Sequence, residues 1–183
     1  MLEEIRCSQL IKDKLEFNSG LNVLTGPDDG ANSIGKSSVL MLLDFALAGD
    51  DFINLCSDVI ENVGVVTVEM DFSFDGVTYS FSRGTNDPKV VIFLSEQGRP
   101  EKSIDEYRSF LKKGFNFPEY SASFRGAINP FSRIWGKDNN NPNKPLNSFP
   151  SEPYSKIKPN LLKLYSLYGS LRVLEKEKFE TEK

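Results

Sequence analysis

The residues best suited to chemistry lie near the start of the chain. Residues 30–37 read Gly-Ala-Asn-Ser-Ile-Gly-Lys-Ser and match the phosphate-binding pattern G-x-x-x-x-G-K-[ST] at every fixed position. Glycines let backbone N–H groups approach phosphate oxygens, because glycines tolerate positive φ and carry no Cβ. Lys36 would reach the β and γ phosphates, Ser37 would hold Mg²⁺ through its hydroxyl, and Ser38 would donate to the α phosphate. The candidate nucleotide-binding residues are Gly30, Ala31, Asn32, Ser33, Ile34, Gly35, Lys36, Ser37 and Ser38, and Ser37 is the candidate metal ligand.

The flanking sequence predicts the elements that would position this loop. Leu21–Thr25 is a short apolar run ended by Gly26, which predicts a buried strand. Residues 39–48 are apolar on nearly every face, which predicts a helix buried against a sheet, with Gly49 as its C′ residue. The N-terminus of that helix would add unpaired N–H groups and a positive dipole end to the site. A strand before the loop and a buried helix after it favour phosphate binding over a chance match.

Composition limits the classes of function. The 183 residues suit one domain with an appendage, and the net charge of −4 gives no global signal for nucleic acid. The absence of histidine excludes histidine-based triads and histidine metal ligands. Cys7 and Cys56 are too far apart for a metal motif and are expected to be free thiols. Residues 1–4 are acidic with no apolar segment after them, and no run is long enough for a membrane span, so we expect a cytoplasmic protein without membrane contact.

The rest of the chain alternates between strand and helix patterns. Residues 2–10 and 14–17 predict two short strands before the loop. Residues 65–74, 77–83 and 89–95 predict an antiparallel meander, with Asp75-Gly76 as a two-residue hairpin turn. The later predictions are a helix over 104–113 that begins with the capping box Ser103–Glu106, a break over 114–123, an aromatic and basic stretch over 124–135, a long loop over 136–153, and a last helix that begins near Pro159.

Two stretches carry a resemblance to a known family. Gly20–Gly26, which reads G-L-N-V-L-T-G, and Gly35–Leu40, which reads G-K-S-S-V-L, resemble the amino-terminal lobe of SMC-like and RecN/RecF-like ATPases of the ABC class. The resemblance covers about the first hundred residues well and the rest by the order of elements. It implies an α/β P-loop NTPase fold with an antiparallel meander, in which residues 1–158 form the lobe and 159–183 form a C-terminal helix that begins a coiled coil. A helix packed on its own domain is the alternative for 159–183.

The departures from that family concern hydrolysis. Its carboxy-terminal lobe supplies the signature motif, the Walker B aspartate, a catalytic glutamate and a switch histidine, and this chain has none of these motifs. Leu94–Gly98 lacks the paired glycines of the signature and is interpreted as a turn, and Val90–Leu94 is interpreted as part of the meander. The family's Q-loop glutamine has no counterpart in the region 123–135, where Asn129 or Arg133 are the candidate replacements. We therefore expect no catalytic residue in this chain.

These points lead to a functional expectation and two alternatives. The resemblance implies an ATP- and Mg²⁺-binding half of an ATPase of the bacterial DNA-repair or phage-defence type, which needs a carboxy-terminal lobe or a second head for hydrolysis. The first alternative is a self-contained P-loop kinase or GTPase, although Asn143–Leu146 lacks the aspartate of a guanine motif. The second is an interaction module with a vestigial site, which would use residues 124–149. DNA is a candidate partner through a loose basic set: Lys89, Arg99, Lys102, Arg108, Lys112 and Lys113.

Overall fold

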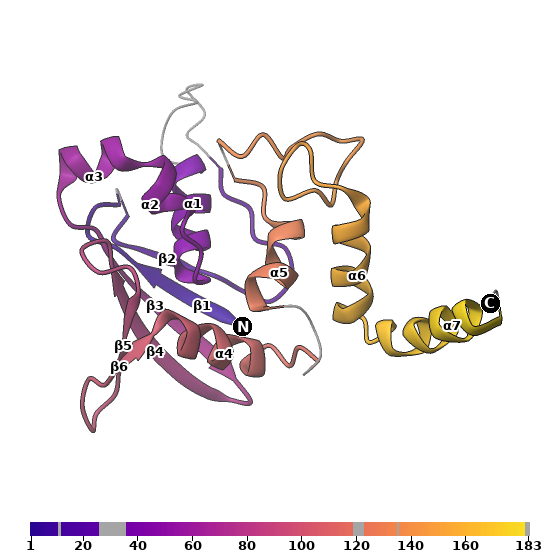
Figure 1. Cartoon of the computed structure of the whole chain (residues 1–183). Helices are drawn as coiled ribbons and strands as arrows, with labels where there is room; N and C mark the ends of the chain where they lie inside the picture. Colours follow the sequence, from indigo (N-terminus) through magenta and orange to yellow (C-terminus); the bar gives the residue numbers. More distant parts are fainter. Residues whose placement is uncertain (11, 26–35, 119–122, 135, 182–183) are drawn as a thin grey trace.

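The chain is an α/β protein built on one antiparallel sheet. The structure is a computed structural model that describes residues 1–10, 12–25, 36–118, 123–134 and 136–181. The six strands lie in the order β2-β1-β3-β4-β5-β6, and each pairs with its neighbour antiparallel (Figure 1). The strands are β1 (Leu2–Arg6), β2 (Lys14–Glu16), β3 (Thr67–Phe74), β4 (Val77–Gly84), β5 (Val90–Leu94) and β6 (Glu101–Ser103). The predicted strand pair and meander are confirmed, while β6 was not predicted because three polar residues carry no alternating pattern.

The predicted hairpin turn joins β3 to β4. Asp75 and Gly76 both have positive φ, 52° and 78°, as a type I′ turn requires. Phe74 pairs with Val77 across this turn, and the ladder continues without a shift to Thr67 and Gly84. The turn therefore sets the register that places the apolar side chains of both strands on one face.

The two faces of the sheet differ in character. Val68, Met70 and Phe72 of β3 are fully buried together with Phe81 of β4, as the alternating pattern predicted. The opposite face carries charges, and Arg6 of β1 forms ion pairs there with Glu4, Glu69 and Asp71. The helices α1 (Lys36–Ala46) and α4 (Ile104–Gly114) pack against the apolar face, so the core is a single layer between the sheet and these helices.

Seven α-helices and one short 3₁₀ helix are assigned within the described part of the chain. They are α1 (Lys36–Ala46), α2 (Asp51–Leu55), α3 (Ser57–Val63), α4 (Ile104–Gly114), α5 (Phe124–Ile128), η1 (Asn129–Phe131), α6 (Tyr154–Leu164) and α7 (Tyr168–Thr181). Helix α1 packs on β3 and α2, and α4 packs on β5, β6 and α5. The capping box at the start of α4 is confirmed, because the Ser103 hydroxyl accepts from Glu106 N–H and the Glu106 carboxylate accepts from Ser103 N–H. None of the helices in the described ranges is long and apolar enough to cross a membrane.

The C-terminal segment differs from the prediction of one helix that begins at Pro159. Helix α6 begins five residues earlier, at Tyr154, so Pro159 lies inside it rather than in its first turn. The chain turns at Ser166, whose φ is 60°, and α7 then extends away from the sheet and the other helices (Figure 1). Val173 and Leu174 of α7 are more than half exposed. The start of a coiled coil remains a prediction for this exposed helix.

Aromatic packing between the sheet and α4 predicts a large difference between two phenylalanine variants. Phe72 is fully buried and its ring contacts those of Phe74, Phe81 and Tyr107, whereas Phe131 is 52% exposed. Phe72→Ala should lower the free energy of unfolding by roughly 3–5 kcal/mol, because it leaves a cavity in the core. Phe131→Ala should lower it by less than about 1 kcal/mol. Urea unfolding followed by circular dichroism measures both, and equal effects would contradict the assigned core.

Candidate functional site

The described part of the phosphate-binding motif is its end. Gly30, Ala31, Asn32, Ser33, Ile34 and Gly35 lie outside the described residues, so their predicted role in binding stays a prediction. Lys36 is the first residue of α1, and Ser37 and Ser38 follow at exposed positions in its first turn. The first N–H groups of any α-helix lack partners inside the helix. The predicted helix after the motif is thus confirmed from Lys36 onward.

The segment before the motif does not form the buried strand that we predicted. Residues 21–25 belong to no strand, and the exposed fractions of Leu21, Val23 and Leu24 are 90%, 70% and 46%. No backbone hydrogen bond joins residues 21–25 to another described residue; only the Asn22 side chain is bonded, to the backbone of Asn18 and Gly20. The reason for the difference is that a buried strand needs a neighbouring strand and a covering layer, and the described residues supply neither here.

An apolar groove runs beside this segment. The groove has a volume of about 790 Å³ and lies between residues 15–24 and one side of α1. Its apolar lining residues are Leu15, Phe17, Leu21, Val23, Leu24, Val39, Leu40 and Leu43. We call it the β2–α1 groove. The prediction that α1 is buried on nearly every face is therefore only partly correct, because Met41, Leu42 and Phe45 face the core while Leu40 is 45% exposed.

Helix α1 ends in a Schellman motif. Gly49 N–H donates to Asp44 C=O at 2.7 Å and Ala48 N–H donates to Phe45 C=O at 3.1 Å. The left-handed residue is Ala48, with φ of 60°, and not Gly49 as predicted. Gly49 is needed for space instead, because a Cβ there would lie 1.8 Å from Asp44 Oδ2. The close approach of the Asp44 carboxylate to the backbone thus explains this glycine.

The fully buried Arg83 holds the end of α1. Its guanidinium donates to the carbonyl oxygens of Phe45 at 2.8 Å, Gly49 at 2.7 Å and Pro88 at 2.8 Å. A fourth bond runs to Asp50 Oδ1 at 2.9 Å, and the guanidinium carbon lies 4.0 Å from the centre of the Phe45 ring. Burial lowers the pKa of Arg83, and the bond to Asp50 opposes that shift. One cation therefore satisfies carbonyls that a helix C-terminus leaves unpaired.

Three further side chains bind the carbonyl oxygens of the residues between Phe45 and Gly49. The hydroxyl of the fully buried Tyr107 donates to Ala46 C=O at 2.8 Å, and burial raises its pKa well above the usual range. Arg125 donates to Leu47 C=O at 3.0 Å, and Arg108 donates to Ala48 C=O at 2.9 Å. Every carbonyl from residue 45 to 49 therefore accepts a hydrogen bond from one of four side chains. We call these four side chains, Arg83, Tyr107, Arg108 and Arg125, the α1 clamp.

Asp44 links the clamp to the rest of α1. Its side chain is almost fully buried and forms an ion pair with Arg125. Burial raises the pKa of Asp44, and the nearby Arg125 acts against that rise. The carboxylate also accepts a long hydrogen bond from Asp51 N–H at 3.4 Å. Arg125, which the sequence analysis placed only in the aromatic and basic stretch 124–135, is thus part of the internal support of the helix.

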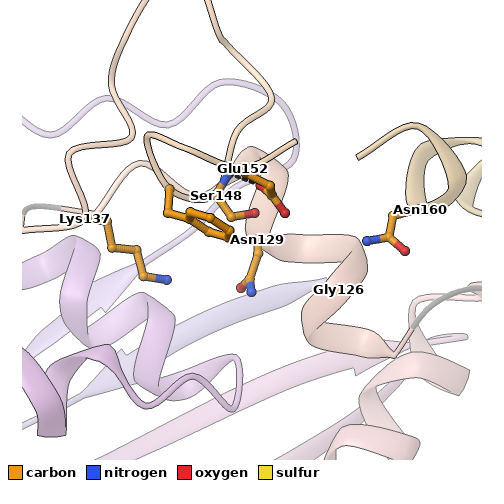
Figure 2. Close-up of a pocket in the computed structure, with 7 residues that line it drawn as sticks. Gly126, Asn129, Lys137, Ser148, Glu152 and Asn160 are labelled. Carbon is orange, nitrogen blue, oxygen red and sulfur yellow. Dashed lines mark hydrogen bonds between the residues drawn. The ribbon is translucent and has the colours of Figure 1, made fainter. Parts of the chain in front are cut away.

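Two polar pockets flank the segment after α5. One of about 530 Å³, the Ser37 pocket, is lined by Ser37 and Leu40 of α1 and by Arg133, Ile134, Gly136, Asp138, Asn139 and Asn140. The other, of about 290 Å³, includes Asn129, Lys137, Glu152 and Asn160, and Figure 2 shows Asn129 between Lys137 and Asn160. Of the two candidate replacements for a Q-loop glutamine, Arg133 thus shares a pocket with Ser37, and Asn129 lines the other one.

The structure also decides several smaller predictions. Strand β5 (Val90–Leu94) runs antiparallel between β4 and β6, so it belongs to the meander as predicted. Ser95 and Gly98 exchange backbone hydrogen bonds, which confirms that Leu94–Gly98 ends in a turn. Arg108 is bound to Ala48 C=O and to Asp50, so it is removed from the loose basic set considered for DNA. Cys7 and Cys56 are free thiols, as expected.

The α1 clamp was missed by sequence reasoning, although one signal was present. Phe81 and Arg83 lie two residues apart in β4 and so point to the same face. Because Phe81 is apolar and expected in the core, Arg83 is expected on the same buried face. A buried guanidinium requires hydrogen-bond acceptors around it. The carbonyls that it binds could not be identified without the position of α1.

Comparisons with known proteins leave the family open. No protein-family model matches this chain, and no curated protein matches it. Function is therefore inferred from the site itself.

The clamp predicts a specific cost for a substitution that keeps the charge of Arg83. Arg83→Lys should lower the free energy of unfolding by at least about 2 kcal/mol, because one ammonium group cannot reach all four acceptors and each buried carbonyl left unpaired costs roughly 1–3 kcal/mol. The matched control is Arg99→Lys, at an exposed position, which should change it by less than about 0.5 kcal/mol. Chemical unfolding measures both variants, and an unchanged Arg83→Lys stability would show that the clamp does not support α1.

Proposed function

We propose that this chain is the ATP-binding half of an SMC-like, ABC-class ATPase. In this proposal residues 30–38 bind Mg-ATP, and a separate carboxy-terminal lobe or a second head supplies the groups for hydrolysis. ATP binding and turnover would be coupled to DNA-related work such as repair, chromosome maintenance or defence. The proposal makes this chain a cytoplasmic protein with a lobe at residues 1–158 and a helical extension after it.

The observation that carries this proposal is the segment at residues 21–25, which pairs with no strand among the described residues. Leu21, Val23 and Leu24 expose apolar side chains directly before the motif, on the edge of the β2–α1 groove. Apolar side chains this exposed are stabilised when another element covers them. These side chains lie beside α1. A strand of a separate lobe would pair with residues 21–25 at this place and fill the groove. An incomplete layer at this place favours a half-site over a self-contained kinase or GTPase.

The support of α1 is consistent with a phosphate site at its other end. The α1 clamp holds residues 45–49 through the side chains of three different parts of the chain. In the N-terminal turn, by contrast, Ser37 and Ser38 lie at exposed positions. A helix fixed at one end and open at the other can present its N–H groups to an anion without moving.

The residues near Ser37 suit a magnesium–phosphate ligand. Mg²⁺ prefers oxygen donors and is commonly held by a hydroxyl or carboxylate together with phosphate oxygens. The Ser37 pocket is lined by Ser37, Asp138 and Asn139, whose side chains carry a hydroxyl, a carboxylate and an amide oxygen. When bound, the cation would supply neutralisation of phosphate charge. The sequence contains no signature, Walker B or switch motif, so we expect binding without appreciable turnover by this chain alone.

Calorimetric titration of Mg-ATP into the chain tests this function. The parent protein should bind, and Lys36→Ala should weaken binding at least about tenfold, which corresponds to about 1.4 kcal/mol. The reason is that the lysine ammonium contacts the β and γ phosphates in this motif. Phosphate release by the chain alone should stay at the level of a blank.

The control variant is Lys113→Ala, because Lys113 is an exposed lysine in the last turn of α4. It should leave the affinity for Mg-ATP unchanged. Equal affinity in the parent and Lys36→Ala would contradict nucleotide binding by the motif. Robust turnover by the chain alone would instead favour a self-contained enzyme.

A further inference from the structure

The Ser37 pocket is lined by a buried asparagine whose amide oxygen has no partner among the described residues. Asn139 is only 3% exposed, and its amide nitrogen donates to Ser132 C=O at 2.8 Å. That bond fixes the orientation of the amide, because a carbonyl oxygen accepts only from the nitrogen side. Asn139 Oδ1 is then left without a hydrogen-bond partner among the described residues. A buried acceptor without a donor is costly, so a bound water, cation or ligand group is expected at this atom.

The same pocket contains an arginine, Arg133, that forms no ion pair with a described carboxylate. Arg133 is half-buried, and its guanidinium donates to Ser132 C=O at 3.2 Å. The ion pairs of the described residues include Arg6, Arg83, Arg108 and Arg125 but not Arg133. A half-buried guanidinium that makes only this hydrogen bond to the described residues is suited to a phosphate, which it can bind through two parallel hydrogen bonds.

The remaining charge in the pocket indicates which kind of anion fits. The Asp138 carboxylate lies in the same lining as Arg133 and Asn139. A bare phosphate would be repelled by this carboxylate, whereas a phosphate that carries a divalent cation would be attracted to it. The combination of one guanidinium, one carboxylate and one amide oxygen therefore fits a metal–phosphate group better than either a cation or an anion alone.

We propose that the Ser37 pocket binds the terminal phosphate and the cation of Mg-ATP, with Arg133 on the phosphate and Asn139 Oδ1 on the hydrated cation. This inference rests on the proposed function, since Ser37 belongs to the phosphate-binding motif. It adds that the segment after η1 (Asn129–Phe131) completes the site from within this chain. Arg133 then distinguishes ATP from ADP, because only the triphosphate extends to the guanidinium.

The test compares the affinities for Mg-ATP and Mg-ADP by calorimetry in the full chain. The parent should prefer Mg-ATP, and Arg133→Ala should reduce that preference about tenfold while the affinity for Mg-ADP stays unchanged. Arg133→Lys should restore part of the preference, because it keeps the charge without the planar pair of donors. Arg99→Ala, which removes an exposed arginine outside the pocket, is the matched control and should behave as the parent. Circular dichroism melting confirms that each variant is folded.

A second arm uses Asn139→Ala and measures how much Mg²⁺ is needed for half-maximal ATP binding. This concentration should rise by about threefold or more, because the cation loses an oxygen contact. If Arg133→Ala leaves the ratio of the two affinities unchanged, or weakens both nucleotides equally, the inference is wrong. Loss of both nucleotides in Lys36→Ala would in that case leave the proposed function intact. Failure of the parent chain to bind either nucleotide would overturn both proposals.

Discussion

The structure depends on how the carbonyl oxygens at the C-terminal end of α1 are satisfied. A helix that ends inside a core leaves carbonyls that neither water nor the helix itself can bond. Here Arg83, Tyr107, Arg108 and Arg125 provide the donors, and they come from β4, α4 and α5. Each of these elements is therefore tied to one point, and the sheet, α4 and α5 keep a fixed relation to α1.

The two ends of α1 lie in different surroundings. The C-terminal end is surrounded by donors, while the N-terminal turn lies beside the Ser37 pocket and the β2–α1 groove. In the first region the carbonyls of residues 45–49 are all paired. In the second region, among the described residues, Leu21 and Val23 are exposed and Asn139 Oδ1 has no partner. In our account the second region is left open for two different occupants. A nucleotide would meet the polar pocket, and a strand from another lobe would meet the apolar groove.

Much of the sheet could be predicted because its signals are local. The alternation of residues 66–74 and the Asp75-Gly76 turn determined β3, β4 and their register from neighbouring residues alone. The strand at 21–25 was predicted wrongly because an apolar run signals burial, and burial depends on a partner that the described residues do not supply. The candidate site was predicted only in part. Lys36 and Ser37 follow from a motif, and Arg133 was one of two candidates for the Q-loop position. Asn139 was not predicted, because it belongs to an asparagine- and proline-rich loop whose path no periodic pattern specifies.

Hydrogen–deuterium exchange of the full chain with and without Mg-ATP tests the central claim most directly. Without nucleotide, amides at 21–25 should exchange quickly and those at 43–49 slowly, because only the latter are hydrogen-bonded within the core. Addition of Mg-ATP should slow exchange at residues 36–40 and at 132–140 while 43–49 stays as it was. Slow exchange at 21–25 in the chain alone, or no change at 36–40 with nucleotide, would contradict a helix that is fixed at one end and open for a phosphate at the other.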